Sequence, residues 1–96
     1  MLNSAAILAA APDQVSCDIG SQTAILNLKN GIYYGLDSVG KRVWELVQTP
    51  RRLGELETTL LSEYDVDVER LVPDVRGLCQ KLVKAGLIEI RDEVRV

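Results

Sequence analysis

The chain lacks histidine and phenylalanine and has two cysteines among its 96 residues. Because histidine is the commonest general acid–base residue, its absence argues against most enzymatic mechanisms. Cys17 and Cys79 lack the C-x-x-C spacing of a redox pair and are too few for a zinc site, so they predict two reduced thiols buried as small apolar side chains. No glycine-rich phosphate loop joins a predicted strand to a helix. These absences predict a protein that is not an enzyme and needs no cofactor or metal.

The chain also lacks a basic stripe and a long apolar run. Its net charge is −3, and Lys41–Arg42 and Arg51–Arg52 are its only paired basic residues, a pattern that disfavours nucleic-acid binding. The apolar run at residues 5–11 has no preceding positive charge and is shorter than the roughly 20 residues of a membrane span. We expect a cytoplasmic protein that does not bind membranes, with a flexible arm over residues 1–13 and a single domain over residues 14–96.

The first part of the domain has the two-residue period of β-strands. Alternating apolar residues predict strands at residues 14–19, 23–28 and 32–36. Gly20-Ser21 suits a tight hairpin between the first two. Asn30-Gly31 is a strong signal for a two-residue type I′ hairpin, in which both central residues need positive φ. Together these segments predict a three-stranded antiparallel meander.

From Asp37 onward the period is that of a helix. Asp37 suits an N-cap that accepts a hydrogen bond from the amide of Gly40, and this first helix ends before Pro50. A second helix is expected over residues 52–64, with its core side chains at helical spacing, namely Leu53, Leu56 and Leu60.

A third helix is expected after Asp67, ending at Gly86, a suitable left-handed terminator. Pro73 leaves two alternatives, a kinked helix or one that restarts at Pro73. Residues 87–90 predict a short strand that Val94 and Val96 extend by pairing. The fold class is therefore α+β, a winged-helix-like module with a three-stranded meander packed on three helices.

The third predicted strand has an unusual edge. Its residues 32–36 include no charge and no proline, the features that usually block an edge strand, and Gly35 would let another backbone approach closely. Such an edge is suited to strand addition by a peptide. The alternatives are that the N-terminal arm covers this edge, or that the tyrosines simply cap the core.

The third helix carries two neighbouring stripes of mainly apolar residues. One stripe is enough for the core of a small domain, so the second predicts a surface for a ligand, unless the helix is buried more deeply than usual. The two stripes are Leu71, Val75, Leu78 and Leu82, and Val72, Arg76, Cys79 and Val83.

Several motifs, in this order and spacing, resemble the PqqD-like family of RiPP recognition elements, which serve ribosomally made, post-translationally modified peptides. They are the strand 33–36 (Tyr-Tyr-Gly-Leu), the helix start 37–40 (Asp-Ser-Val-Gly), Trp-Glu-Leu at 44–46, residues 63–67, Asp-Val at 74–75 and the helix end at 82–87. The resemblance covers about residues 14–90. It implies a non-catalytic protein that binds the leader segment of a precursor peptide.

In this family the leader adds as an antiparallel strand beside the third strand and lies in a groove formed with the third helix. Carried over to this chain, the resemblance implies a peptide-binding site made of Ile32, Tyr33, Tyr34, Gly35, Leu36, Val72, Val75, Arg76, Cys79 and Val83.

The resemblance leaves the pathway open. We favour a lasso-type role, in which the partners are the precursor leader peptide, a leader-cleaving cysteine protease and a cyclase. The alternative is a peptide chaperone for a radical SAM enzyme in pyrroloquinoline quinone biosynthesis. A winged-helix DNA-binding regulator is a third reading, but the third helix offers it few basic residues, namely Arg76, Lys81 and Lys84.

Overall fold

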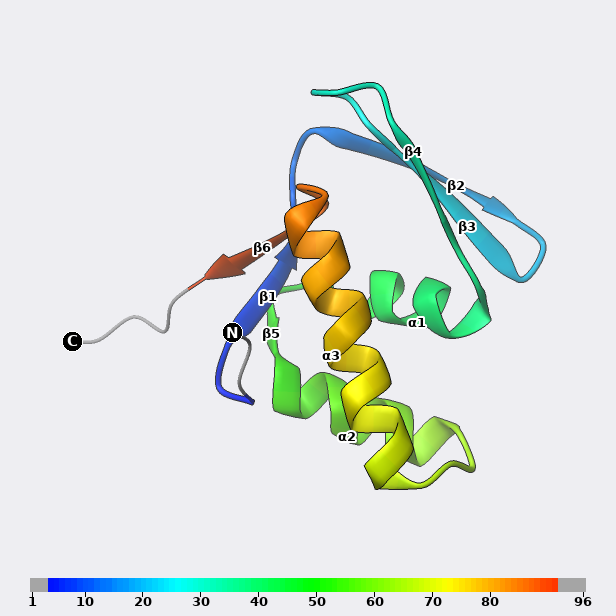
Figure 1. Cartoon of the computed structure of the whole chain (residues 1–96), viewed down its shortest axis with the longest axis vertical. Coiled ribbons are helices and arrows are strands. Elements are labelled where there is room, and N and C mark those ends of the chain that lie inside the picture. The colour runs from blue at the N-terminus through cyan, green and yellow to red at the C-terminus, as the bar shows by residue number, and fades with distance from the viewer. Residues whose placement is uncertain (1–3, 92–96) are drawn as a thin grey trace.

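The computed structural model describes residues 4–91, so Val94, Val96 and the first three residues of the expected arm lie outside the described residues. Two three-stranded antiparallel sheets and three helices make up the described part (Figure 1). The elements in chain order are β1 (Ile7–Ala10), β2 (Gln14–Ile19), β3 (Gln22–Asn27), β4 (Tyr33–Leu36), α1 (Ser38–Leu46), β5 (Arg51–Arg52), α2 (Leu53–Glu63), α3 (Val68–Lys84) and β6 (Ile88–Arg91).

The predicted meander is confirmed as the sheet β2-β3-β4. Gly20 has a φ of +61° in the first hairpin, whereas Ser21 does not have a positive φ, the pattern of a type II′ turn. The type I′ prediction for Asn30-Gly31 is wrong, because Asn30 has no positive φ. Instead residues 28–31 form a four-residue loop: the Asn30 side chain accepts a hydrogen bond from the amide of Ile32 at 3.0 Å, and Gly31 alone takes a positive φ of +71°.

The expectation of a flexible arm over residues 1–13 is wrong for residues 7–10. They form β1, the central strand of the second sheet, between β5 and β6. Leu8 of β1 is fully buried in the core. This strand is stabilised by partners that lie more than 40 residues away in sequence, at Arg52 and Ile88, so the fold begins before residue 14.

The three helices lie where their periods predict them. The carboxylate of Asp37 accepts a hydrogen bond from the amide of Gly40 at 2.8 Å, which confirms the N-cap of α1. All three predicted core leucines of α2 are fully buried. Helix α3 begins at Val68 and continues through Pro73, so it does not restart at the proline. Gly86 ends it with a φ of +76°.

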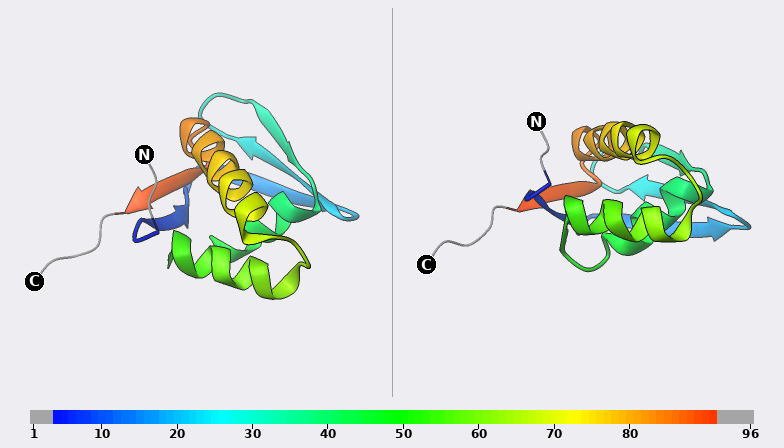
Figure 2. Two further views of the ribbon diagram at one scale, coloured as in Figure 1. Left: turned by 60° about the horizontal axis from the view of Figure 1, so that its bottom comes forward. Right: turned by 90° about the horizontal axis from the view of Figure 1, so that it is seen from below.

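A single core joins both sheets to the three helices. It includes Leu8 of β1, Ile25 of β3, Trp44 of α1, Leu56 of α2 and Leu82 of α3, and the α+β class is thereby confirmed. In Figure 1, α3 is seen between the meander and the second sheet, and the right view of Figure 2 shows that it lies on one side of both. No helix within residues 4–91 is both long and apolar enough to cross a membrane.

Candidate functional site

Strand β4 has an open edge. It pairs with β3 on one side, and no other strand within residues 4–91 pairs with its second side. The described part of the N-terminal segment does not cover this edge, since β1 belongs to the other sheet. The open edge therefore offers unpaired backbone groups to another chain.

The register shows which backbone groups these are. The amide of Asn27 donates to the carbonyl of Ile32 at 3.0 Å, and hydrogen-bonded pairs alternate along an antiparallel ladder. The pairs Ile25–Tyr34 and Thr23–Leu36 therefore bond within the sheet. The N–H and C=O groups of the two alternate residues, Tyr33 and Gly35, therefore point to the open side.

The side chains of β4 alternate between two environments. Tyr34 packs against the core and Leu36 is buried, on the face that carries Ile25 of β3. Tyr33 is 71% exposed on the opposite face. Gly35 is exposed, and an added Cβ there would have no neighbouring atom within 4 Å. The strand is thus anchored through one face while its edge stays accessible.

A hollow of about 510 Å³ lies between α3 and the start of α1, immediately after the end of β4, and we call it the β4–α3 hollow. Its first wall is the start of α1 and the residue before it. Its second wall is one side of α3. The lining residues are Asp37, Val39, Gly40, Pro73, Asp74, Val75, Gly77, Leu78 and Lys81.

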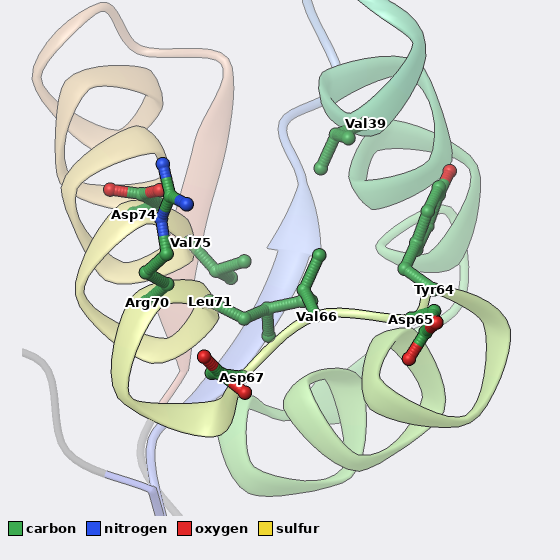
Figure 3. Close-up of a pocket in the computed structure, with 9 residues that line it drawn as sticks. All are labelled: Val39, Tyr64, Asp65, Val66, Asp67, Arg70, Leu71, Asp74 and Val75. Carbon is green, nitrogen blue, oxygen red and sulfur yellow. The ribbon is translucent and has the colours of Figure 1, made fainter.

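A second hollow, also of about 510 Å³, lies where the α2–α3 loop meets α1 and α3, and we call it the loop hollow (Figure 3). Val39, Asp74 and Val75 line both hollows, so the two adjoin. The other lining residues are Tyr64, Asp65, Val66, Asp67, Arg70 and Leu71. Together the hollows extend the open edge of β4 toward the α2–α3 loop.

The structure brings only part of the predicted α3 site to these hollows. Val75 lines both of them. Arg76 instead bonds to Glu57 of α2, and Cys79 is fully buried. Burial, together with the charge of Glu57, raises the pKa of the Cys79 thiol to about 12. Neither hollow is lined by Val72, Arg76, Cys79 or Val83.

Sequence reasoning missed the α3 residues that line the β4–α3 hollow opposite the start of α1. These include Gly77 and Lys81, which are exposed, and Leu78, which is half-buried and which the stripe analysis assigned to the core. A signal for them existed in Gly77, because a glycine inside a helix costs stability and often marks a close approach by another group.

The arrangement is that of a binding surface. Within residues 4–91 no three histidine, cysteine, aspartate or glutamate side chains gather closely enough to hold a metal ion. What the site offers is free backbone groups on β4 beside partly apolar hollows, the combination by which β-strand addition recognises a peptide.

The family model for coenzyme PQQ synthesis protein D (PqqD) matches residues 22–88, a region that includes β4 and α3. The chain belongs to the PqqD family. This confirms the resemblance inferred from the motifs around residues 33–46. A search of curated proteins found no match. Among solved structures, this PqqD-family chain is similar to TbiB1 in complex with the TbiA(beta) leader peptide, with 30% identity and a TM-score of 0.79 over 88% of this chain and 99% of that one.

Proposed function

We propose that this chain is a non-catalytic recognition protein for the leader segment of a ribosomally made precursor peptide. The observation that carries the proposal is the open edge of β4 beside the β4–α3 hollow. It is supported by the likeness to TbiB1, a protein of 30% identity whose structure holds a leader peptide.

In this proposal the leader adds as an antiparallel strand beside β4. Tyr33 and Gly35 each supply one donor and one acceptor to it, and these backbone bonds give affinity without reading the leader's sequence. Gly35 lets the leader backbone come close, because it has no side chain in the way. Ile32, Tyr34 and Leu36 are proposed as contacts from the same segment.

Specificity comes from the α3 wall. The half-buried Leu78 gives it an apolar surface above the buried Val75, and the gap at Gly77 leaves room for a leader side chain. The contacts predicted for Val72, Arg76, Cys79 and Val83 stay predictions. Arg76 is paired with Glu57 of α2, Cys79 is buried and Val83 packs against the core, which favours a role in the stability of the domain rather than in contact with the leader.

We further propose that the bound leader is delivered to partner enzymes, a leader-cleaving cysteine protease and a cyclase of a lasso-peptide pathway. Binding would raise the concentration of the cleavage site near the protease. The alternative partner is a radical SAM enzyme of pyrroloquinoline quinone biosynthesis, which the family model's description favours. The two pathways are distinguished by measuring the rate at which each enzyme processes its precursor peptide with and without this protein. The true partner is the enzyme whose rate rises when the protein is added.

The test is a fluorescence anisotropy titration. A fluorescein-labelled synthetic leader, from the precursor peptide encoded beside this protein's gene, is titrated with the purified chain, and a scrambled peptide of the same composition is the control. We expect saturable binding in the micromolar range or tighter for the leader, after the cost of ordering a flexible peptide. Equal binding of leader and scrambled peptide, or none, would overturn the proposal.

A further inference from the structure

We propose that the loop hollow binds a lysine or arginine side chain of the leader, from the segment just N-terminal to the added strand. This inference rests on the proposed function and adds to it a preference for charge at one subsite. Three features carry it: the place of the hollow relative to β4, its apolar lining and its unpaired carboxylates.

The direction of the added strand leads to the loop hollow. A strand antiparallel to β4 begins beside Leu36 and ends beside Tyr33. Leader residues upstream of that strand therefore pass Asp37 and enter the β4–α3 hollow. Since Val39 and Val75 line both hollows, the next stretch of leader reaches the loop hollow.

The lining of the loop hollow suits a long aliphatic chain. Val39 of α1, Leu71 and Val75 of α3 and Val66 of the loop surround the space, and the ring of Tyr64 stands on the far side (Figure 3). Lysine and arginine lay their methylene stems along such surfaces and keep the charged end in water. The apolar lining alone would accept any long side chain.

The charged residues that line the hollow favour a cationic side chain over a neutral or acidic one. Asp65, Asp67 and Asp74 line the hollow with one guanidinium, that of Arg70, so its net charge is −2 (one positive and three negative groups). None of the three carboxylates forms an ion pair or hydrogen bond within residues 4–91. A cationic side chain would complement them, whereas a glutamate would be repelled.

The test uses the labelled synthetic leader in a positional series. Each residue upstream of the added strand is replaced singly by lysine, by norleucine, which keeps the stem without the charge, and by glutamate. At one or two adjacent positions we expect lysine to bind about fivefold more tightly than norleucine, since exposed ion pairs are individually weak. Glutamate should bind more weakly than norleucine, and 0.5 M NaCl should reduce both differences.

Protein variants then locate the effect. The double variant Asp65→Asn with Asp67→Asn should lose the preference for lysine. A matched control, Glu55→Gln with Glu89→Gln, changes the net charge equally at two exposed residues outside both hollows and should keep it.

Three results would overturn the inference. Equal binding of the lysine and norleucine peptides overturns it while leaving the proposed function intact. An equal loss of preference in the control variant shows an effect of net charge rather than of the hollow. Failure of every peptide in the series to bind overturns the inference and the proposed function together.

Discussion

The guanidinium of Arg76 lies against the carboxylate of Glu57, with Nε 2.9 Å from Oε2, and this pair joins α3 to α2. The Glu57 side chain is 8% exposed, so its charge depends on Arg76 for compensation. The hydrogen bond with Glu57 raises the pKa of Arg76 further above the ordinary value of arginine. The pair fixes which side of α3 faces α2, and the opposite side, with Asp74 and Leu78, faces the start of α1.

Replacing Arg76 by alanine should lower the urea midpoint of unfolding without changing affinity for the leader. The reason is that the Glu57 carboxylate then remains buried without its partner. Circular dichroism measures the midpoint and anisotropy measures the affinity. Lys84→Ala removes an exposed cation from the same helix and should leave both unchanged. A stable Arg76→Ala variant with weakened leader binding would return Arg76 to the peptide site.

Replacing Trp44 by alanine should reduce the free energy of unfolding by about 3–5 kcal/mol, the usual cost of deleting a large buried ring. Trp44 is 4% exposed within the core. Because the variant has lost the only tryptophan, urea unfolding is followed by far-ultraviolet circular dichroism. Trp44→Phe keeps an aromatic ring, so its free energy of unfolding should fall by less than that of the alanine variant. A loss below about 1 kcal/mol for the alanine variant would show that the ring contributes little to the core.

Much of the fold could be predicted because its signals are local. The alternating pattern of β2 and β3, the Asp37 cap and the leucine spacing of α2 each depend on residues close together in sequence. Strand β1 has no such signal: its alanine-rich residues pair with segments near Arg52 and Ile88, and only the tertiary fold brings these together.

The open edge of β4 could be predicted for the same reason, whereas the side of α3 that lines the hollows could not. Adjacent stripes on a helix differ by about 100° of rotation, and both stripes of α3 are mainly apolar. The rotation of α3 is set by the contact of Arg76 with Glu57 and by the burial of Cys79, and neither follows from spacing alone. The β4–α3 hollow is therefore lined by Gly77 and Leu78, which the pattern did not predict as ligand contacts.

Replacing Gly77 by leucine should stabilise the protein and weaken leader binding. An added Cβ meets no atom within 4 Å, and replacing a helical glycine contributes about 0.5–1 kcal/mol to the free energy of unfolding. The longer side chain would occupy the β4–α3 hollow and weaken binding by about tenfold, the usual scale of overpacking. Gly77→Ala is the control that gains stability with little obstruction. If the leucine variant bound the leader as tightly as the alanine variant, the hollow would not hold the leader.

The two thiols should differ in reactivity and in their effect on stability. Cys17 is exposed and should react rapidly with Ellman's reagent at pH 8, whereas Cys79, with a pKa of about 12, should react only when the protein opens. A Cys17→Ser variant should therefore lose the fast phase of the reaction with Ellman's reagent and keep only the slow phase of Cys79. A fast phase in this variant would contradict the burial of Cys79.

The raised pKa of Cys79 also predicts whether the free energy of unfolding rises or falls with pH. The thiol ionises near pH 9 in the unfolded chain and stays protonated to about pH 12 in the folded one. This residue therefore makes the free energy of unfolding fall as pH rises through that window, by about 1.4 kcal/mol per pH unit. Urea unfolding of Cys79→Ala at pH 7 and pH 10 should show a smaller fall than in the unmodified protein.

Strand addition at β4 is tested most directly by comparing Tyr33→Pro with Tyr33→Ala in the leader titration. Both variants remove the same exposed ring, but only proline removes the backbone N–H that points to the open edge, and proline is tolerated at the first residue of an edge strand. We predict that Tyr33→Pro binds the leader about 3- to 10-fold more weakly than Tyr33→Ala, the worth of one backbone hydrogen bond. Equal affinities for the two folded variants would contradict strand addition to β4.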